Sequence, residues 1–253
     1  MRSFSIVVAA DLANGIGLNG GLPWRLRKDM AFFAKITSKV INNNNQQHHQ
    51  PLKHLNACIM GRRTWESIPT KFRPLISRFN VIVSRNPHYL DDKPEKNNPL
   101  VALAPSLEAA LDLIESLQPS SSDSSQSSSL SAAAMAAASI LPSPLPLVPE
   151  TPVVTSTSSI TPKIHIDRIF LIGGAQLYDQ GVSSKDCHHI FLTRIHTTVD
   201  CDTFFPKLSE SEYKLLSSSE SHAFLEQYLQ EPVEGGIIEE AGFNYEYTVY
   251  NRI

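Results

Sequence analysis

Residues 169–178 read IFLIGGAQLY, an apolar run that ends in two glycines and passes directly into an amphipathic segment. The pattern is typical of a buried strand followed by a tight turn and a helix from Ala175 to Gln180. Backbone N–H groups and the positive end of that helix would face the space beyond the carboxyl end of the strand, where open α/β sheets bind ligands. Glycines at such turns also serve packing alone, so this segment by itself leaves both interpretations open.

Similar apolar runs, most of them without alternation, recur along the chain and predict strands buried on both faces. They read FSIVVAA, ACIM, FNVIVS, LVAL and IFLTRI. Further helices are predicted over 26–37, 63–68 and 107–117, the last with Ser106 as its N-cap. Because strands and helices alternate, we expect an α/β fold with a largely parallel sheet. The alternating stretch NYEYTVY at 244–250 predicts one antiparallel strand with a wet face, and hence a mixed sheet.

Composition excludes several classes of protein. The 253 residues include 22 basic and 25 acidic side chains, a net charge of −3, so no electrostatic footprint for nucleic acid or an anionic membrane stands out. Three cysteines without a C-x-x-C pair favour a reducing compartment over a disulfide scaffold. The N-terminus does not resemble a signal peptide and no apolar run approaches transmembrane length, so we expect a soluble, cytoplasmic protein.

Two segments interrupt the alternation of strands and helices. Residues 42–50 read NNNNQQHHQ and are expected to be a loop insertion, because His48 and His49 lack the partners that a metal site needs. Residues 118–162 are rich in Ser, Ala and Pro and contain no aromatic residue, which predicts a disordered surface insertion. Since a crossover loop can be lengthened at small entropic cost, we expect one domain over 1–253 that contains both insertions.

The glycines of NGIGLNG, at positions 15, 17 and 20, match G-x-G-x-x-G after a strand. A dinucleotide-binding fingerprint requires a helix to open at the third glycine, whereas Gly21, Leu22 and Pro23 follow here. We therefore expect a glycine-rich loop, which beside a site can act as a lid.

Basic and hydroxyl side chains follow two of the predicted strands. The first strand ends at Gly61 in IMGRRTWESIP and the second is FNVIVS. The residues concerned are Arg62, Arg63, Thr64, Ser84 and Arg85. Either group alone would be interpreted as solvated surface charge. If the two strands are neighbours in a parallel sheet, both groups meet at one edge and together favour a phosphate site.

An acid, Asp29, lies in the stretch GGLPWRLRKDMAFF. We predict three apolar residues on the same helix face as Asp29: Leu26 three positions before it, Phe33 four positions after it, and the adjacent Met30. An acid in a first helical turn is also favoured by the helix dipole alone. A carboxylate on an apolar face must be paired or protonated, and the neighbouring Arg27 and Lys28 point to other faces. A basic heterocycle with two parallel N–H donors would satisfy it.

Taken in order, these motifs together with RPL, LTRI and DTFFP resemble dihydrofolate reductase over residues 4–117 and 163–253. No single motif is decisive, but the ordered set is specific. The resemblance implies NADPH-dependent reduction of 7,8-dihydrofolate to 5,6,7,8-tetrahydrofolate, which supports one-carbon metabolism and thymidylate and purine synthesis. It also implies a mostly parallel eight-stranded sheet with an antiparallel C-terminal strand, flanked by helices.

The resemblance implies that Asp29 holds the 2-amino group and N3 of the pteridine and supports protonation of N5. Trp24 would order a water beside that carboxylate, Thr193 would join it from a neighbouring strand, and Leu22 would complete the catalytic set. The remaining substrate residues would be Val8, Ala9, Met30, Phe33, Ile68, Leu75, Ile172 and Tyr178. Arg73 would pair with the α-carboxylate of folate.

For the cofactor, the resemblance implies that the 2′-phosphate lies near Arg62, Ser84 and Arg85, with Arg63 and Thr64 along the other phosphates. The pyrophosphate would meet Gly173, Gly174, Ala175 and Gln176, with a cis peptide between the two glycines. The cofactor set also includes Ala9, Ile16, Gly61, Ile172 and Leu177. No metal is required for this chemistry. We expect a monomer that binds dihydrofolate and antifolates such as methotrexate, and neither nucleic acid nor membrane.

Two alternatives remain at this point. One is the related reductase of riboflavin synthesis, which is expected to lack the Pro-Trp pair, the helix acid and the arginine of RPL. The other is a catalytically silent binding module whose Ser/Pro-rich insertion docks other proteins.

Overall fold

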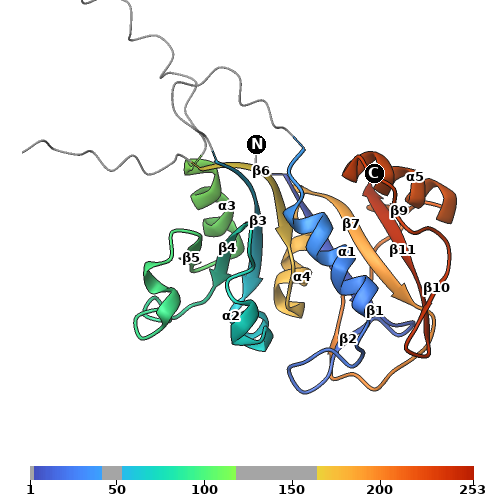
Figure 1. The fold of residues 1–253 in the computed structure, drawn as a ribbon, viewed down its shortest axis with the longest axis horizontal. Helices are drawn as coiled ribbons and strands as arrows, with labels where there is room; N and C mark the ends of the chain where they lie inside the picture. The colour runs from blue at the N-terminus through green and yellow to red at the C-terminus, as the bar shows by residue number, and fades with distance from the viewer. Residues whose placement is uncertain (1–2, 42–52, 118–163) are drawn as a thin grey trace, which may run out of the picture.

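The computed structural model describes residues 3–41, 53–117 and 164–253, which form a mixed sheet covered by helices on both faces (Figure 1). The strands are β1 (Phe4–Ala10), β2 (Gly15–Gly17), β3 (Lys53–Gly61), β4 (Arg78–Val83), β5 (Val101–Ala104), β6 (Ile164–Leu171), β7 (Cys187–Ile195), β8 (Thr203–Phe204), β9 (Tyr213–Leu215), β10 (Ile238–Glu240) and β11 (Phe243–Arg252). The helices are α1 (Arg27–Ser38), α2 (Arg62–Ser67), α3 (Leu107–Ser116), α4 (Ala175–Ser183) and α5 (Ser218–Leu229), with 3₁₀ turns η1 (Thr70–Phe72) and η2 (Pro94–Asn97). Both predicted insertions, 42–50 and 118–162, lie outside the described residues.

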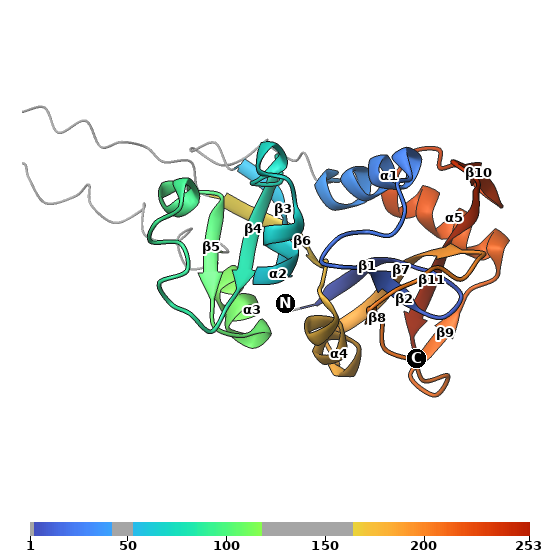
Figure 2. The same cartoon turned by 90° about the horizontal axis from the view of Figure 1, so that it is seen from below.

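The strand order confirms the predicted mixed, mostly parallel sheet. From one edge to the other the path runs β10, β11, β7, β1, β6, β3, β4 and β5, and β9 pairs with β11 beside this path. The six strands from β7 to β5 run parallel, whereas β11 runs antiparallel to β7, as its alternation predicted (Figure 2). A separate two-stranded sheet joins β2 to β8. Parallel strands place their carboxyl ends at one edge, so the segments that follow β1, β3, β4, β6 and β7 gather there.

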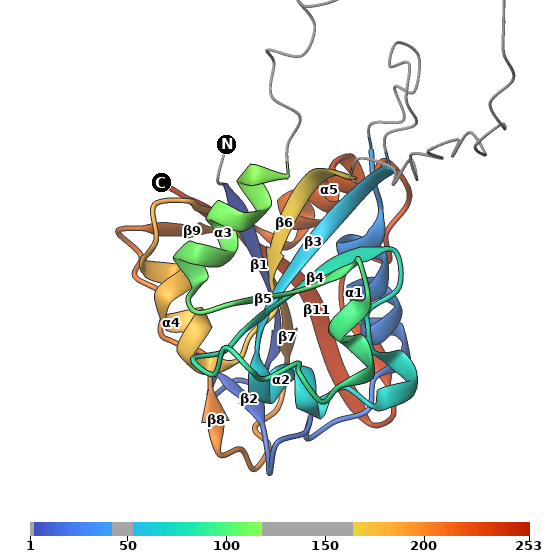
Figure 3. The same cartoon turned by 90° about the vertical axis from the view of Figure 1, so that its left-hand side faces the viewer.

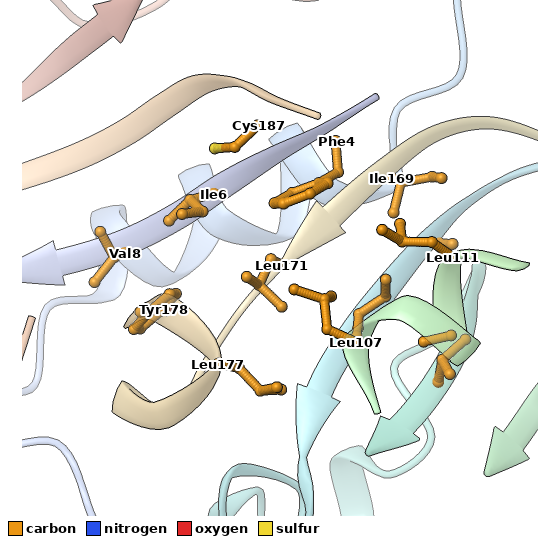
Figure 4. Close-up of a cluster of buried hydrophobic side chains, with 14 of the residues drawn as sticks. Phe4, Ile6, Val8, Leu107, Leu111, Ile169, Leu171, Leu177, Tyr178 and Cys187 are labelled. Atoms are coloured by element: carbon orange, nitrogen blue, oxygen red, sulfur yellow. The ribbon is translucent and has the colours of Figure 1, made fainter. Parts of the chain in front are cut away.

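Helices cover both faces because the central strands are apolar on both sides. On one face α3 and α4 pack against β1 and β6, with Phe4, Ile6 and Leu171 in the centre (Figure 4). On the other face α1, α2 and α5 pack against Val7 and Phe191. The continuous apolar run of β1 therefore supplies alternate residues to two separate clusters.

The buried face of α1 differs from the predicted one. Asp29 is buried as expected, but Phe32 and Ile36 accompany it, whereas Met30 is 49% exposed. Adjacent helical residues point about 100° apart, so Met30 cannot share the face that Asp29 forms with residues three and seven positions later. The prediction that Met30 shares the buried helix face of Asp29 was wrong.

The other predicted helices are present with shifted ends, and one helix had not been predicted. Ser106 caps α3, because its hydroxyl accepts a hydrogen bond of 3.1 Å from the amide of Ala109. Helix α4 continues to Ser183, beyond its predicted end. The unpredicted helix is α5, although Ser217 and Glu220 form a capping box at its start.

The three cysteines are free thiols, and Cys58 and Cys187 are buried. Within the three described stretches, none of the helices combines the length and the apolar character needed to cross a bilayer.

Candidate active site

Asp29 lies where α1 approaches the carboxyl end of β7. The Thr193 hydroxyl donates a hydrogen bond of 2.7 Å to Asp29 Oδ1, and Thr193 pairs with Ala9 across the β1–β7 ladder. Asp29 is only 7% exposed, and burial raises the pKa of its carboxyl to about 6. The Thr193 hydrogen bond lowers this pKa and the charge of Glu240 raises it, but loss of hydration dominates. The predicted junction of Asp29 and Thr193 is thus present.

Residues from the end of the chain position α1. Leu26 provides no side-chain cap; instead the Glu240 carboxylate accepts hydrogen bonds from the amides of Arg27 (2.7 Å) and Lys28 (3.0 Å). The Tyr247 ring stacks on Phe32 with centroids 3.9 Å apart, which holds the buried side of the helix against β11. Sequence reasoning missed both supports, because the partners lie more than 200 residues away along the chain.

Trp24 is buried just before α1, and its indole N–H has no hydrogen-bond partner among the described residues. A buried indole donor normally finds a partner, protein or water. This orphaned group supports the prediction that Trp24 holds a water near Asp29. The hydrogen bond that Asp29 accepts from the described residues comes from the Thr193 hydroxyl, to Oδ1.

The glycine-rich loop is tied down at its base by Asp11. This buried carboxylate accepts hydrogen bonds from the amides of Ala13 (2.9 Å) and Gly15 (2.6 Å) through Oδ1, and from Val199 (2.8 Å) through Oδ2. Ile16 packs against the core, whereas Leu22 is 55% exposed at the far side of the loop. Sequence reasoning missed Asp11, whose partner Val199 could only be found from the fold.

The two glycines after β6 form a close backbone contact. Their peptide bond is cis, as predicted, and the Gly61 amide donates a hydrogen bond of 2.7 Å to the Gly173 carbonyl. Gly173 has a positive φ of 105°, and a Cβ on Gly174 would lie 3.2 Å from Thr64 Oγ1, so neither position suits a side chain. The first turn of α4 has no side-chain cap, which leaves its amide end available to an anion.

The predicted phosphate residues meet at one edge. Gly61 pairs with Val83 in the parallel β3–β4 ladder, so the residues after the two strands are neighbours. Arg62, Arg63 and Arg85 are exposed, Thr64 is half-buried, and Ser84 is buried. Cationic side chains beside the uncapped start of α4, over a glycine backbone that admits no side chain, fit the phosphates of a dinucleotide such as NADPH.

Arg73 lies half-buried over the Trp65 ring, with its guanidinium carbon 5.5 Å from the ring centroid. It donates hydrogen bonds to the Trp65 carbonyl (3.4 Å) and the Thr70 hydroxyl (3.2 Å), while its buried Nε has no partner within the described chain. A stacked guanidinium with free donor capacity suits a carboxylate.

The apolar residues predicted to line the substrate pocket divide into two groups. Those with partial or greater exposure, and so available to a ligand, are Ala9, Met30, Phe33 and Ile68, while Leu75 and Ile172 are buried in the cluster on the α1 face. Val8 and Tyr178 pack in the opposite cluster, as does Leu177, which was predicted to contact the cofactor. The Tyr178 hydroxyl donates to the Val7 carbonyl at 2.9 Å, so Tyr178 positions β1. Val7, whose side chain lies on the Asp29 side of the sheet, was missed.

Comparisons with known proteins identify the family of this chain. Residues 3–120 and 147–229 match the family model described as dihydrofolate reductase. Among curated relatives, a dihydrofolate reductase of Pneumocystis carinii is 31% identical over 99% of this chain and 97% of its own, and one of Heliothis virescens is 29% identical over 98% and 97%. The solved dihydrofolate reductase of Schistosoma mansoni superposes with a TM-score of 0.58, at 28% identity over 98% of this chain and 97% of that one. The chain belongs to the dihydrofolate reductase family, whose members reduce 7,8-dihydrofolate to 5,6,7,8-tetrahydrofolate with NADPH.

Proposed function

We propose that Asp29 is the residue on which dihydrofolate reduction depends in this chain. The supporting observation is a buried carboxylate whose Oδ1 accepts a hydrogen bond from the Thr193 hydroxyl, with Oδ2 as its second acceptor. That oxygen, together with Oδ1, suits the parallel N–H donors of the pteridine 2-amino group and N3. NADPH, when bound, supplies the hydride that C6 of the pteridine receives.

Asp29 also controls the proton that N5 must receive. Because burial raises its pKa to about 6, a fraction of the carboxyl stays protonated near neutral pH. The proton passes from this carboxyl to N5 through a water that the orphaned Trp24 indole orients. Thr193 fixes the carboxyl plane through its hydrogen bond to Oδ1, so the acid is held ready for the substrate.

The rest of the substrate is held by the walls and mouth of the same site. Met30, Phe33 and Ile68 contact the apolar part of the molecule, while Leu22 closes over the reacting rings from the glycine-rich loop. Arg73, stacked on Trp65, pairs bidentately with the α-carboxylate.

The cofactor is held at the start of α4 and across the ends of β3 and β4. Amides after Gly174 bind the pyrophosphate, and Arg62, Ser84 and Arg85 bind the 2′-phosphate. All of these groups come from one chain, which supports a monomeric enzyme. The three free thiols suit a reducing compartment such as the cytoplasm.

The decisive experiment follows the absorbance of reduced nicotinamide when purified protein meets NADPH and dihydrofolate, with and without methotrexate. We expect oxidation that requires dihydrofolate and is abolished by the inhibitor. A folded protein that binds NADPH but leaves it unoxidised would overturn the proposal, and would move the pyrimidine-reductase and binding-module alternatives forward.

The cofactor assignment has a separate test. Replacement of Arg62 and Arg85 together by Ala should lower the ratio of kcat/KM for NADPH to kcat/KM for NADH about tenfold or more. A charge-assisted contact with a phosphate contributes about 1.5–3 kcal/mol, and an exposed one contributes less. The control is Lys214→Ala, an exposed cation on β9. An unaltered ratio in the double variant would refute the position of the 2′-phosphate.

A further inference from the structure

A cluster of metal-ligating side chains lies at the edge of the sheet opposite Asp29. It consists of His54 near the start of β3 and of His165 and Asp167 near the start of β6. His54 Nδ1 lies 2.8 Å from Asp167 Oδ1, and His165 Nε2 lies 3.6 Å from the same oxygen. The three ligand atoms all lie within 4.8 Å of one another. None of these residues belongs to the reductase site described above.

The strand register builds this cluster. His54 and His165 are direct partners in the parallel β3–β6 ladder, whose amino ends lie side by side (Figure 3). Beyond the Leu55–Ile166 pair, β6 contains one extra residue, so that Asp167 and Arg168 both lie opposite Asn56. Asp167 is two residues from His165, on the same face of its strand. Paired strands fix all three side chains, a more precise support than loops provide.

The cluster is partly buried, and one of its carboxylate oxygens lacks a hydrogen-bond partner among the described residues. The exposed fractions of the side chains are 18% for His54, 34% for His165 and 11% for Asp167. Asp167 Oδ2 is buried and has no hydrogen-bond partner within the described stretches. A buried carboxylate oxygen without a partner requires an explanation, and a bound cation is one that also accounts for the two imidazoles beside it.

The cation next to Asp167 in the sequence, Arg168, contacts helix α5. Arg168 donates a hydrogen bond of 3.0 Å to the Tyr228 carbonyl and stacks over the Tyr228 ring at 3.7 Å. Its guanidinium is held by α5 and donates no hydrogen bond to Asp167 Oδ2, although its charge interacts with that of Asp167. The carboxylate keeps its capacity for another positive charge.

We propose that His54, His165 and Asp167 bind a divalent transition-metal ion of the zinc type. Two imidazoles and one carboxylate are the ligands of such ions rather than of Mg²⁺ or Ca²⁺. Zinc ligands lie about 2.0–2.2 Å from the ion, which puts two tetrahedral ligands about 3.4 Å apart. Two separations from Asp167 Oδ1, 2.8 and 3.6 Å, lie on either side of that value, and all three ligand atoms lie within 4.8 Å of one another, so side-chain rotations that draw them together complete the site.

A bound ion would join β3 to β6 at their amino ends. These ends are also where the chain resumes after each stretch outside the description, at Lys53 and Ile164. The ion would thus stabilise the sheet where its central strands begin. The reductase site, at the carboxyl ends of the strands, would remain unchanged. The three protein ligands leave a fourth position for water.

The test is calorimetric titration of ZnCl₂ into the full-length, untagged protein after chelation, with MgCl₂ as the comparison ion. We expect zinc binding that weakens at least tenfold in His165→Ala and in Asp167→Asn, and no binding of magnesium. The double variant His48→Ala/His49→Ala is the matched control, because it removes the adjacent histidines of NNNNQQHHQ and should bind zinc as the unaltered protein does.

Two further readouts guard against misfolded variants. Zinc should raise the melting temperature of the unaltered protein and of the control but not of His165→Ala, and NADPH oxidation should show that each variant is folded. Cobalt in place of zinc should give the visible absorbance of a tetrahedral site only where the three ligands are intact. Equal zinc affinity in His165→Ala, or loss of binding in the control alone, would overturn the proposal.

Discussion

Two buried carboxylates at the same edge of the sheet, Asp11 and Asp29, differ in the hydrogen bonds that they accept. Asp11 is fully buried and accepts hydrogen bonds from three backbone amides, those of Ala13, Gly15 and Val199. Asp29 is almost as deeply buried but accepts one hydrogen bond, from Thr193, among the described residues. Burying a charge costs free energy that hydrogen bonds offset, and Asp11 accepts three such bonds from the backbone whereas Asp29 accepts one from a side chain.

The difference separates a structural acid from a functional one. A carboxylate whose oxygens are filled by backbone amides fixes the loop that provides them. A buried carboxylate with a single hydroxyl partner and a raised pKa keeps the capacity to take a ligand with N–H donors, or a proton. Substitutions at the two positions should therefore change different properties of the protein.

The largest effect is expected from Asp29→Asn. The amide cannot supply a proton or accept both pteridine donors, so turnover at pH 7 should fall about 100-fold or more while NADPH binding is retained. Steady-state kinetics and NADPH titration measure the two quantities. Turnover that stays within a few-fold of the unaltered enzyme would show that Asp29 does not have this role.

The same substitution should stabilise the fold at neutral pH. The pKa of Asp29 is raised from 3.8 to about 6 on folding, so the native state binds more protons than the unfolded state between these values. The free energy of unfolding therefore falls as pH rises through this window, by at most about 3 kcal/mol, and stays lower above it. Urea unfolding at pH 7.5 should show a higher midpoint for Asp29→Asn, and at pH 3.5 the difference should disappear.

The next largest effect is expected from Asp11→Asn, and it should be an effect on stability. The amide group must turn an N–H₂ toward a backbone N–H, which leaves buried donors unsatisfied and lowers the free energy of unfolding by about 2–4 kcal/mol. The matched control is Asp202→Asn, since Asp202 accepts the Asn19 amide at 2.7 Å but is exposed. Equal unfolding midpoints for the two variants would contradict the structural role of Asp11.

The smallest effect is expected from Thr193→Val. Loss of the hydroxyl removes the hydrogen bond that lowers the pKa of Asp29, so the apparent pKa in the pH profile of hydride transfer should rise by about half a unit to one unit. Thr248→Val is the control, because it removes a hydroxyl that donates to the Leu192 carbonyl on the same pair of strands. A profile that moves equally in both variants would mean that the shift reports packing rather than the hydrogen bond to Asp29.

Sequence patterns predicted the parts of this molecule that local physics decides. The continuous apolar runs identified the central parallel strands, and the alternation around Tyr245 identified the antiparallel one. The Gly173–Gly174 turn and the burial of Asp29 were also predictable, because each depends on residues a few positions away.

The contacts that sequence patterns did not predict join residues far apart in the sequence. Glu240 caps α1 from a strand formed more than 200 residues later, and Val199 completes the shell of Asp11. The prediction that Met30 shares a face with Asp29 was wrong because the helix face that includes Asp29 continues through Phe32. Helix α5 could have been found, since the spacing of Ser217 and Glu220 is a recognised start signal.

The polarity of the sheet also has a practical consequence for engineering. The carboxyl ends of α1 and α3 and the amino ends of β3 and β6 lie at the edge away from Asp29 (Figure 1). Reporter domains or affinity handles inserted near Ile41 or Leu117 would enter the molecule far from the reacting carboxyl. Reporter domains or affinity handles attached at the amino ends of β3 and β6 should therefore leave the rate of catalysis unchanged.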